Sequence, residues 1–100
     1  MYILSALEIR NVIPQEIMLN AYPDPFNPVT TLSFSVPDEG MVQLSIYNIS
    51  GQMITTLAPE LKEPGIYEYS WDANAYPSGV YFARLNLGPQ SYTQKLVLMK

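Results

Sequence analysis

Apolar and polar residues alternate along most of this chain, which is the pattern of half-buried β-strands. In residues 30–36, Leu32, Phe34 and Val36 take every second position, and polar residues stand between them. Further strand-like stretches follow at residues 42–46, 52–57, 65–72, 80–87 and 92–99. Gly, Pro, Asn and Asp separate these stretches and favour turns. With one more short edge strand expected at residues 13–19 and no helical period beyond one turn, the sequence predicts an all-β antiparallel sandwich of about seven strands.

Residues 22–28, with the sequence Tyr-Pro-Asp-Pro-Phe-Asn-Pro, interrupt this pattern. Each proline fixes its own φ and keeps the preceding residue out of the helical region. Proline also lacks a backbone N–H, so this segment is predicted to lie at a sheet edge or at a crossover between sheets. Tyr22 and Phe26 are its large apolar residues, and we expect both to anchor it on the core.

Trp71 is the only tryptophan, and Tyr67 and Tyr69 share its face of a predicted strand. A core position that closes one end of the sandwich explains Trp71 better than a ligand platform does. Carbohydrate stacking is another possible use for the eight tyrosines, three phenylalanines and one tryptophan. Most of these rings fall at inward positions, which leaves Tyr76 and Tyr2 as free platforms, too few to define a sugar site.

The composition fits a domain with one hydrophobic core and argues against several functions. The 100 residues are 48% hydrophobic and 14% charged, enough for a single domain. The net charge is −4 and the five basic residues are scattered, which argues against binding of nucleic acid. No run reaches the roughly 18 apolar residues that a membrane-spanning helix needs.

The chain contains neither cysteine nor histidine. This excludes disulfide bonds, thiolate nucleophiles, imidazole bases and the usual zinc ligands. The close carboxylate pairs are Asp38 with Glu39 in a predicted turn, and Glu60 with Glu63 in a predicted charged loop at residues 58–64. Both pairs are better explained as solvated connectors, so we predict no enzyme activity, no catalytic residue, no cofactor and no metal site.

Five blocks of sequence, in order and in register, resemble the C-terminal sorting domain of the type IX (Por) secretion system. They are residues 19–37, 46–52, 65–72, 78–82 and 95–100. The family's opening signature is Tyr-Pro-Asn-Pro-Phe-Asn-Pro, and Asp24 stands where it has its first Asn. The matching structural residues are Tyr22, Pro23, Pro25, Phe26, Asn27 and Pro28, with Trp71 further along. The resemblance implies an immunoglobulin-like β-sandwich, related to the immunoglobulin-like domain of the flagellar hook-capping protein.

The same resemblance implies a non-catalytic module at the C-terminal end of a larger protein from a Gram-negative bacterium. Such a module passes through the periplasm and is recognised by the type IX outer-membrane translocon. In many cases a sortase-like peptidase then removes it and joins the cargo to surface lipopolysaccharide, so the upstream cargo domain is secreted or held at the cell surface. The residues that match the family's signal are Lys95, Val97, Leu98, Met99, Lys100, Gly79 and Tyr81.

A purely structural interpretation of these residues is also open. The last strand then only completes a sheet, with Lys95 and Lys100 protecting its edge. Gly79 and Tyr81 fit a structural role better than a recognition role.

Residues 1–11 are predicted to form an arm in front of a domain at residues 12–100. The arm is more apolar than a flexible linker, and it suits pairing with the open edge of a neighbour. The alternative function is therefore a structural subunit that self-associates by strand exchange, and a monomer both with and without the arm would exclude it. The arm is equally explained as the tail of an upstream domain. It lacks the basic leader of a secretory signal peptide, so we expect an export signal further upstream.

Overall fold

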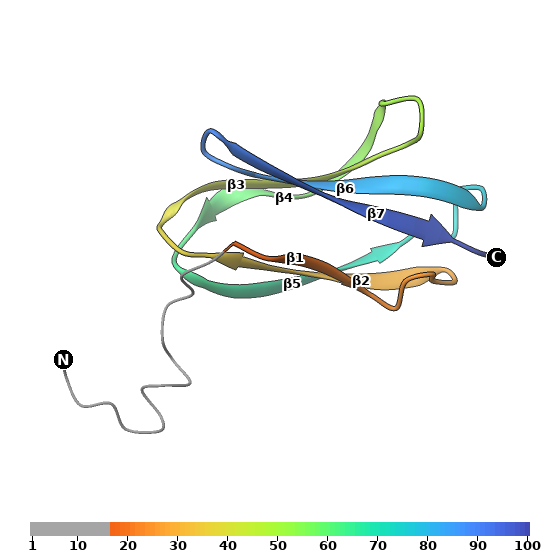
Figure 1. Cartoon of the computed structure of the whole chain (residues 1–100), viewed down its shortest axis with the longest axis horizontal. Coiled ribbons are helices and arrows are strands. Elements are labelled where there is room, and N and C mark those ends of the chain that lie inside the picture. Colours follow the sequence, from red (N-terminus) through yellow and green to blue (C-terminus); the bar gives the residue numbers. More distant parts are fainter. Residues whose placement is uncertain (1–16) are drawn as a thin grey trace, which may run out of the picture.

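Seven strands form two antiparallel sheets in the computed structural model, which describes residues 17–100. The strands are β1 (Leu19–Tyr22), β2 (Val29–Val36), β3 (Gly40–Tyr47), β4 (Met53–Lys62), β5 (Gly65–Asp72), β6 (Gly79–Leu87) and β7 (Gln90–Leu98). One sheet has the order β1-β2-β5 and the other has the order β4-β3-β6-β7. Figure 1 shows the sheets as two stacked layers, so the predicted all-β sandwich is confirmed. The described residues include no helix that is long and apolar enough to cross a membrane.

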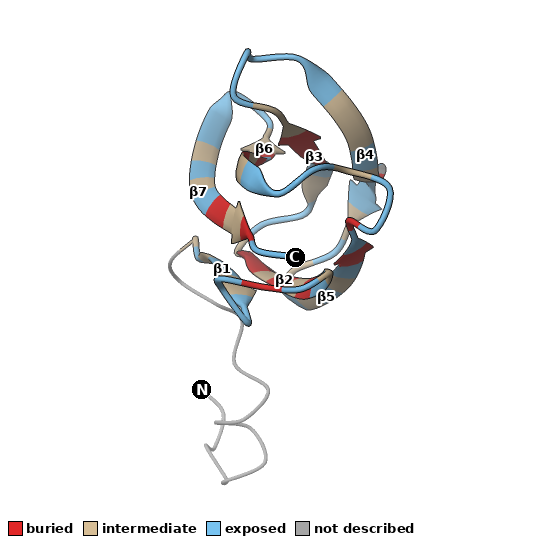
Figure 2. Ribbon diagram, turned by 90° about the vertical axis from the view of Figure 1, so that its right-hand side faces the viewer, coloured by how far each residue is buried: buried red, intermediate tan, exposed pale blue. Residues whose placement is uncertain are grey.

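The core lies between the two layers and is built from the alternating apolar positions. In β2, Leu32, Phe34 and Val36 are at most 1% exposed. The side of the four-stranded sheet that faces β2 is buried to the same extent. Its residues there are Val42, Leu44, Ile46, Ala83, Leu85, Leu96 and Leu98. Because successive residues of a strand point to opposite faces, a period of two in the sequence places one apolar row of each strand in this core (Figure 2).

The first edge strand lies later in the chain than predicted. β1 covers Leu19–Tyr22, whereas the prediction covered residues 13–19, of which 13–16 lie outside the described residues. β1 pairs with β2 from Leu19 opposite Phe34 to Tyr22 opposite Thr31. The ladder therefore runs up to the first proline of the 22–28 segment, where the backbone N–H is lost.

The predicted charged loop at residues 58–64 is largely strand, because β4 continues to Lys62. Two register shifts in the β3–β4 pairing, at Leu44/Ser45 and Ile46/Tyr47, accommodate this long strand. β4 is an edge strand, where a proline such as Pro59 is tolerated. The charged residues gain partners there: Lys62 Nζ lies 3.0 Å from a carboxylate oxygen of Glu60 and 4.7 Å from the centre of the Tyr67 ring.

Two aromatic residues take the opposite roles to those predicted. Tyr22 is 80% exposed and does not anchor the proline-rich segment, because Leu19 and Ala21 occupy the inward positions of β1. Tyr76 is not a free platform, because it packs against the core, with its ring centre 5.7 Å from that of Trp71. Tyr2 and the arm at residues 1–11 lie outside the described residues.

Candidate functional site

The last strand, β7, is an edge strand whose two faces differ sharply. Leu96 and Leu98 are at most 1% exposed and belong to the core. Val97, which lies between them, is half-buried, and the flanking residues Lys95 and Met99 are exposed. The alternation of β7 thus divides the predicted signal residues into an inner side that holds the fold and an outer side that meets solvent.

The proline-rich segment lies along the free edge of β7 and pairs with its end. Phe26 forms an isolated parallel bridge with Leu98. The Phe26 N–H donates to the Val97 carbonyl at 2.9 Å, and the Met99 N–H donates to the Phe26 carbonyl at 2.9 Å. An edge that would otherwise offer unpaired backbone groups is therefore covered at its C-terminal end.

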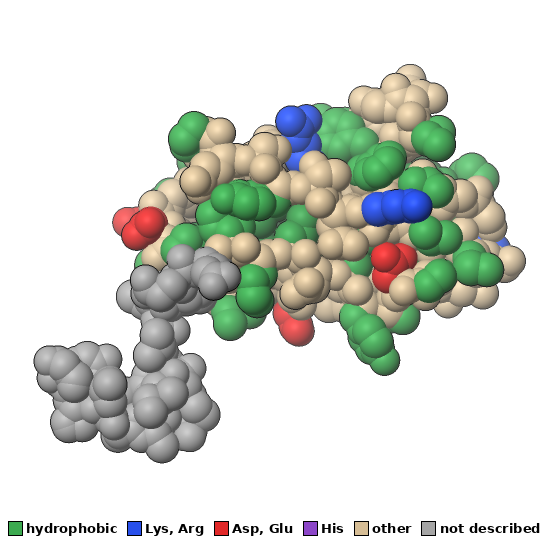
Figure 3. Space-filling model, in the orientation of Figure 1, with side chains coloured by type: hydrophobic (Ala, Val, Ile, Leu, Met, Phe, Trp, Pro, Cys, Tyr) green, Lys and Arg blue, Asp and Glu red, His purple; other side chains and the backbone are tan. Residues whose placement is uncertain are grey.

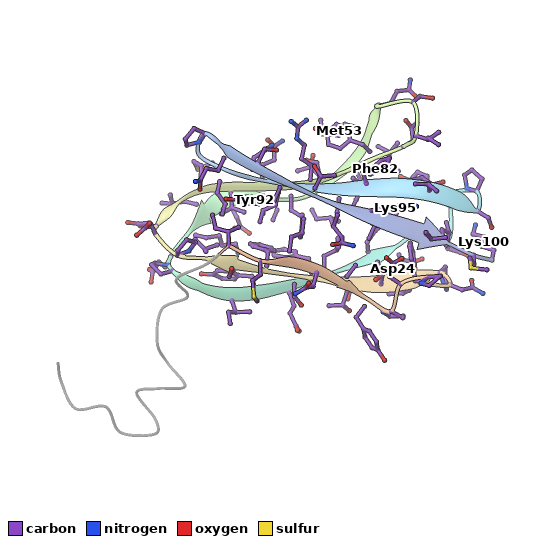
Figure 4. The ribbon with its side chains drawn as sticks, viewed as in Figure 1. Asp24, Met53, Phe82, Tyr92, Lys95 and Lys100 are labelled. Carbon is purple, nitrogen blue, oxygen red and sulfur yellow. The ribbon has the colours of Figure 1, made fainter. Side chains whose placement is uncertain are left out.

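Asp24 completes this backbone pairing with its side chain. Its Oδ1 accepts a hydrogen bond from the Val97 N–H at 2.9 Å, and Figure 4 shows Asp24 close to the end of β7. An Asn side chain carries the same acceptor oxygen. The Asp that departs from the family signature therefore preserves the function of the side chain in this contact.

The connector between β5 and β6 holds the other side of the chain end. The backbone N–H of Lys100 donates to Ser78 Oγ at 3.1 Å, and Lys100 Nζ donates to the Asn74 carbonyl at 2.7 Å. Gly79 pairs with Leu98 and has a φ of 150°, which side chains rarely allow, although no atom lies close enough to exclude a Cβ there. Lys100 is thus fixed at its backbone and at its ammonium group.

Tyr81 lies in the core and not on the surface of the site. Its ring is 5% exposed, and its hydroxyl donates to the Pro77 carbonyl, four residues upstream, at 2.6 Å. This resembles the tyrosine corner of immunoglobulin-like sandwiches. Burial raises the pKa of Tyr81, and the neighbouring Tyr76 raises it further.

An aromatic cluster supports this end of the sandwich. The Trp71 ring centre lies 5.6 Å from that of Phe26, 5.7 Å from that of Tyr76 and 5.5 Å from that of Tyr81. Offset and edge-to-face pairs at these distances are favourable. Trp71 is 4% exposed, so it closes this end of the core, in agreement with the sequence analysis.

The other signature residues shape the turn that leads into β2. The Pro23 carbonyl accepts from Thr30 Oγ1 at 2.8 Å, and Thr30 is fully buried. The Pro28 carbonyl accepts from the Ala73 N–H at 2.9 Å. The exposed signature residues are Tyr22, Pro23, Pro25 and Asn27.

Sequence reasoning missed four residues that belong to this site. Asp24, Asn74 and Ser78 hold the end of the chain through side-chain or carbonyl acceptors, and Leu96 anchors β7. The period of two could have identified Leu96. The contacts of Asp24 and Ser78 join segments 73 and 22 residues apart, so no local pattern predicts them. No three His, Cys, Asp or Glu side chains gather within the described part of the chain in a way that could hold a metal ion.

One family model matches the chain over residues 20–99, and its description is secretion system C-terminal sorting domain. The match includes the proline-rich segment, the aromatic cluster and β7. No curated protein matches the chain.

Proposed function

This chain belongs to the family of secretion system C-terminal sorting domains, and from that premise we propose that the type IX machinery recognises its folded C-terminal end. The module itself is non-catalytic. It directs an upstream cargo domain through the outer-membrane translocon, and the mature protein is secreted or held at the cell surface. A sortase-like peptidase that removes the module from a larger precursor belongs to the same proposal.

The observation that supports recognition of a folded end is the arrangement of β7. Lys95 and Met99 are exposed, while Leu96 and Leu98 are locked in the core. The Val97 N–H donates to Asp24, and Phe26 donates to the Val97 carbonyl and accepts from the Met99 N–H, so the backbone here is fixed. A strand held in this way presents its outward side chains from a fixed backbone, which lowers the entropic cost of binding.

Removing residues 95–100 is a poor test, because it also removes Leu96 and Leu98 from the core. The sharper variant replaces only exposed side chains, as Lys95→Gln, Met99→Ser and Lys100→Gln together. Of these three, Lys100→Gln also removes the ammonium hydrogen bond to the Asn74 carbonyl. Residues 1–100 are fused behind a signal peptide and a fluorescent cargo in a bacterium with an active type IX system. We expect the unchanged fusion to deliver cargo to the surface or the medium and the triple variant to leave it in the periplasm.

A folding control accompanies this experiment. Surface substitutions change the free energy of unfolding only slightly, and each 0.2 kcal/mol lost lowers the Tm of a domain of this size by about 1 °C. The Tm of the purified triple variant should therefore lie close to that of the unchanged chain. Equal export of both fusions would show that the outward residues of β7 are not the signal. Retention of the unchanged fusion would contradict the sorting function itself.

A further inference from the structure

The outer surface of the four-stranded sheet combines basic and apolar side chains. The register aligns Met53, Tyr47, Phe82 and Lys95 in one row across β4, β3, β6 and β7. In the next row, Arg84 of β6 stands opposite Thr93 of β7. We call these six residues the outer basic face. It includes no Asp or Glu, although the chain carries a net charge of −4.

Arg84 is held in place but has no carboxylate partner. Its Nε donates to Ser91 Oγ at 2.9 Å, and its guanidinium carbon lies 6.0 Å from the centre of the Tyr47 ring. Among the described residues, the one salt bridge joins Lys62 to Glu60, so neither Arg84 nor Lys95 is paired with a carboxylate. A guanidinium that is held through Nε and lies over a ring leaves its terminal N–H groups in the fork geometry that matches a carboxylate.

A shallow hollow lies beside this guanidinium. Arg84, Tyr47, Phe82, Ile49 and Thr93 contribute to its lining, and its volume is about 240 Å³. Ile49 lines the hollow and is 75% exposed, and Met53, which is opposite Tyr47 in the register, is 51% exposed, so apolar surface borders the hollow. Figure 4 shows Met53 and Phe82 at the outer side of the upper layer. Figure 3 shows one basic group above that layer next to green apolar patches, and a second basic group lower down, next to a green patch and a red acidic group.

The charges favour a protein partner over a membrane or a nucleic acid. Binding to an anionic membrane surface generally uses clusters of roughly 4–8 Lys or Arg residues, and a phosphate backbone likewise needs several. The outer basic face has two, within an acidic chain. A protein segment with one carboxylate beside an apolar side chain would pair with Arg84 and fill the hollow.

We propose that the outer basic face docks a protein segment that places a carboxylate on Arg84 and an apolar side chain in the hollow. This inference rests on the proposed function, because the segment belongs to the secretion machinery. It adds that recognition extends from the outward side of β7, through Lys95, across β6 to Arg84. The machinery thus recognises a folded sheet face, which a linear C-terminal peptide does not supply.

The test compares two variants that each make the net charge more negative by one unit. Arg84→Gln acts on the outer basic face, and Ser70→Glu acts on an exposed position of the three-stranded sheet. In the same full-chain cargo fusion, we expect Arg84→Gln to lower export roughly tenfold, the equivalent of one charge-assisted hydrogen bond. Ser70→Glu should export like the unchanged fusion. Ser91→Ala keeps the charge but frees the guanidinium, so we expect a smaller loss.

Urea unfolding of each purified chain separates a recognition defect from a folding defect, and the Arg84→Gln midpoint should equal that of Ser70→Glu. Normal export of Arg84→Gln, with the β7 triple variant retained, would overturn this inference and leave the sorting function intact. Equal losses for Arg84→Gln and Ser70→Glu would also overturn it, by assigning the effect to net charge. Binding of the unchanged chain, but not of Arg84→Gln, to anionic phospholipid vesicles would assign the face to a membrane instead. Retention of the unchanged fusion would contradict the sorting function and this inference together.

Discussion

At the scale of single residues, the contact between Asp24 and the Val97 N–H needs an oxygen acceptor and not a charge. We therefore predict that Asp24→Asn changes the free energy of unfolding by less than about 0.5 kcal/mol, whereas Asp24→Ala lowers it by about 1 kcal/mol. Urea unfolding of both variants measures this difference. A loss in Asp24→Asn as large as that in Asp24→Ala would show that the negative charge carries the contact.

Tyr81 is the residue whose hydroxyl ties β6 to the preceding connector. Tyr81→Phe removes the bond to the Pro77 carbonyl, and we predict that this lowers the free energy of unfolding by about 1 kcal/mol at neutral pH. The ring itself stays in the aromatic cluster. An unchanged free energy would mean that water replaces the hydroxyl at no cost.

The raised pKa of Tyr81 also predicts a dependence on alkaline pH. A folded-state pKa above the unfolded value means that the native state holds its proton more tightly, so stability is intact below the ordinary value of 10.0 and falls as pH rises above it. Tyr81→Phe should weaken this alkaline decline, measured as the change of the urea midpoint between neutral and alkaline pH. The same decline in both proteins would assign it to other groups.

At the scale of elements, β7 has an inner side for folding and an outer side for recognition. Leu96→Ala removes a fully buried side chain, and we predict a loss of about 3 kcal/mol in the free energy of unfolding. Lys95→Gln, on the adjacent outward position, should change it by less than about 0.5 kcal/mol. Chemical unfolding of the two variants tests the division. Comparable losses would show that β7 is not divided in this way.

The end of β4 is fastened to β5 by charge and aromatic contacts. Glu60 accepts from the Tyr69 hydroxyl at 3.0 Å and pairs with Lys62, and the hydrogen bond with Lys62 is the main cause of its lowered pKa. A lowered pKa means that this contribution is present above the ordinary value of 4.5 and is lost as pH falls below it. We predict that Glu60→Gln reduces the acid-side decline of the unfolding midpoint. An unchanged decline would exclude Glu60 as a source.

The sequence predicted strands well where apolar and polar residues alternate regularly. It predicted them poorly where contacts between distant segments determine whether a strand forms. Leu32, Phe34 and Val36 are buried as their spacing predicts, because one face of β2 meets the core. The extension of β4 through Pro59 to Lys62 escaped prediction, since a proline and a charged run are typical of loops. These residues form a strand because β4 lies at a sheet edge and because Glu60 and Lys62 contact the tyrosine rings of β5. Neither feature is visible in the local sequence.

At the scale of the whole molecule, the site joins the two ends of the domain. The proline-rich segment enters the fold where the last strand leaves it. Asp24 accepts a hydrogen bond from the Val97 N–H, and Phe26 forms backbone hydrogen bonds with Val97 and Met99. The five sequence blocks that carry the family resemblance correctly predicted the sandwich and the family. They could not show that Phe26 lies against β7 while Tyr22 points to solvent, because that choice depends on pairing between distant strands.

The central claim is that this folded domain directs a cargo outward through the type IX machinery. The most direct measurement is the distribution of a fluorescent cargo fused to residues 1–100 between the periplasm and the cell exterior, in a competent strain and in the same strain without its translocon. We expect cargo at the surface or in the medium of the competent strain, and cargo confined to the periplasm without the translocon. A folded fusion that stays in the periplasm of both strains would show that this domain does not direct export.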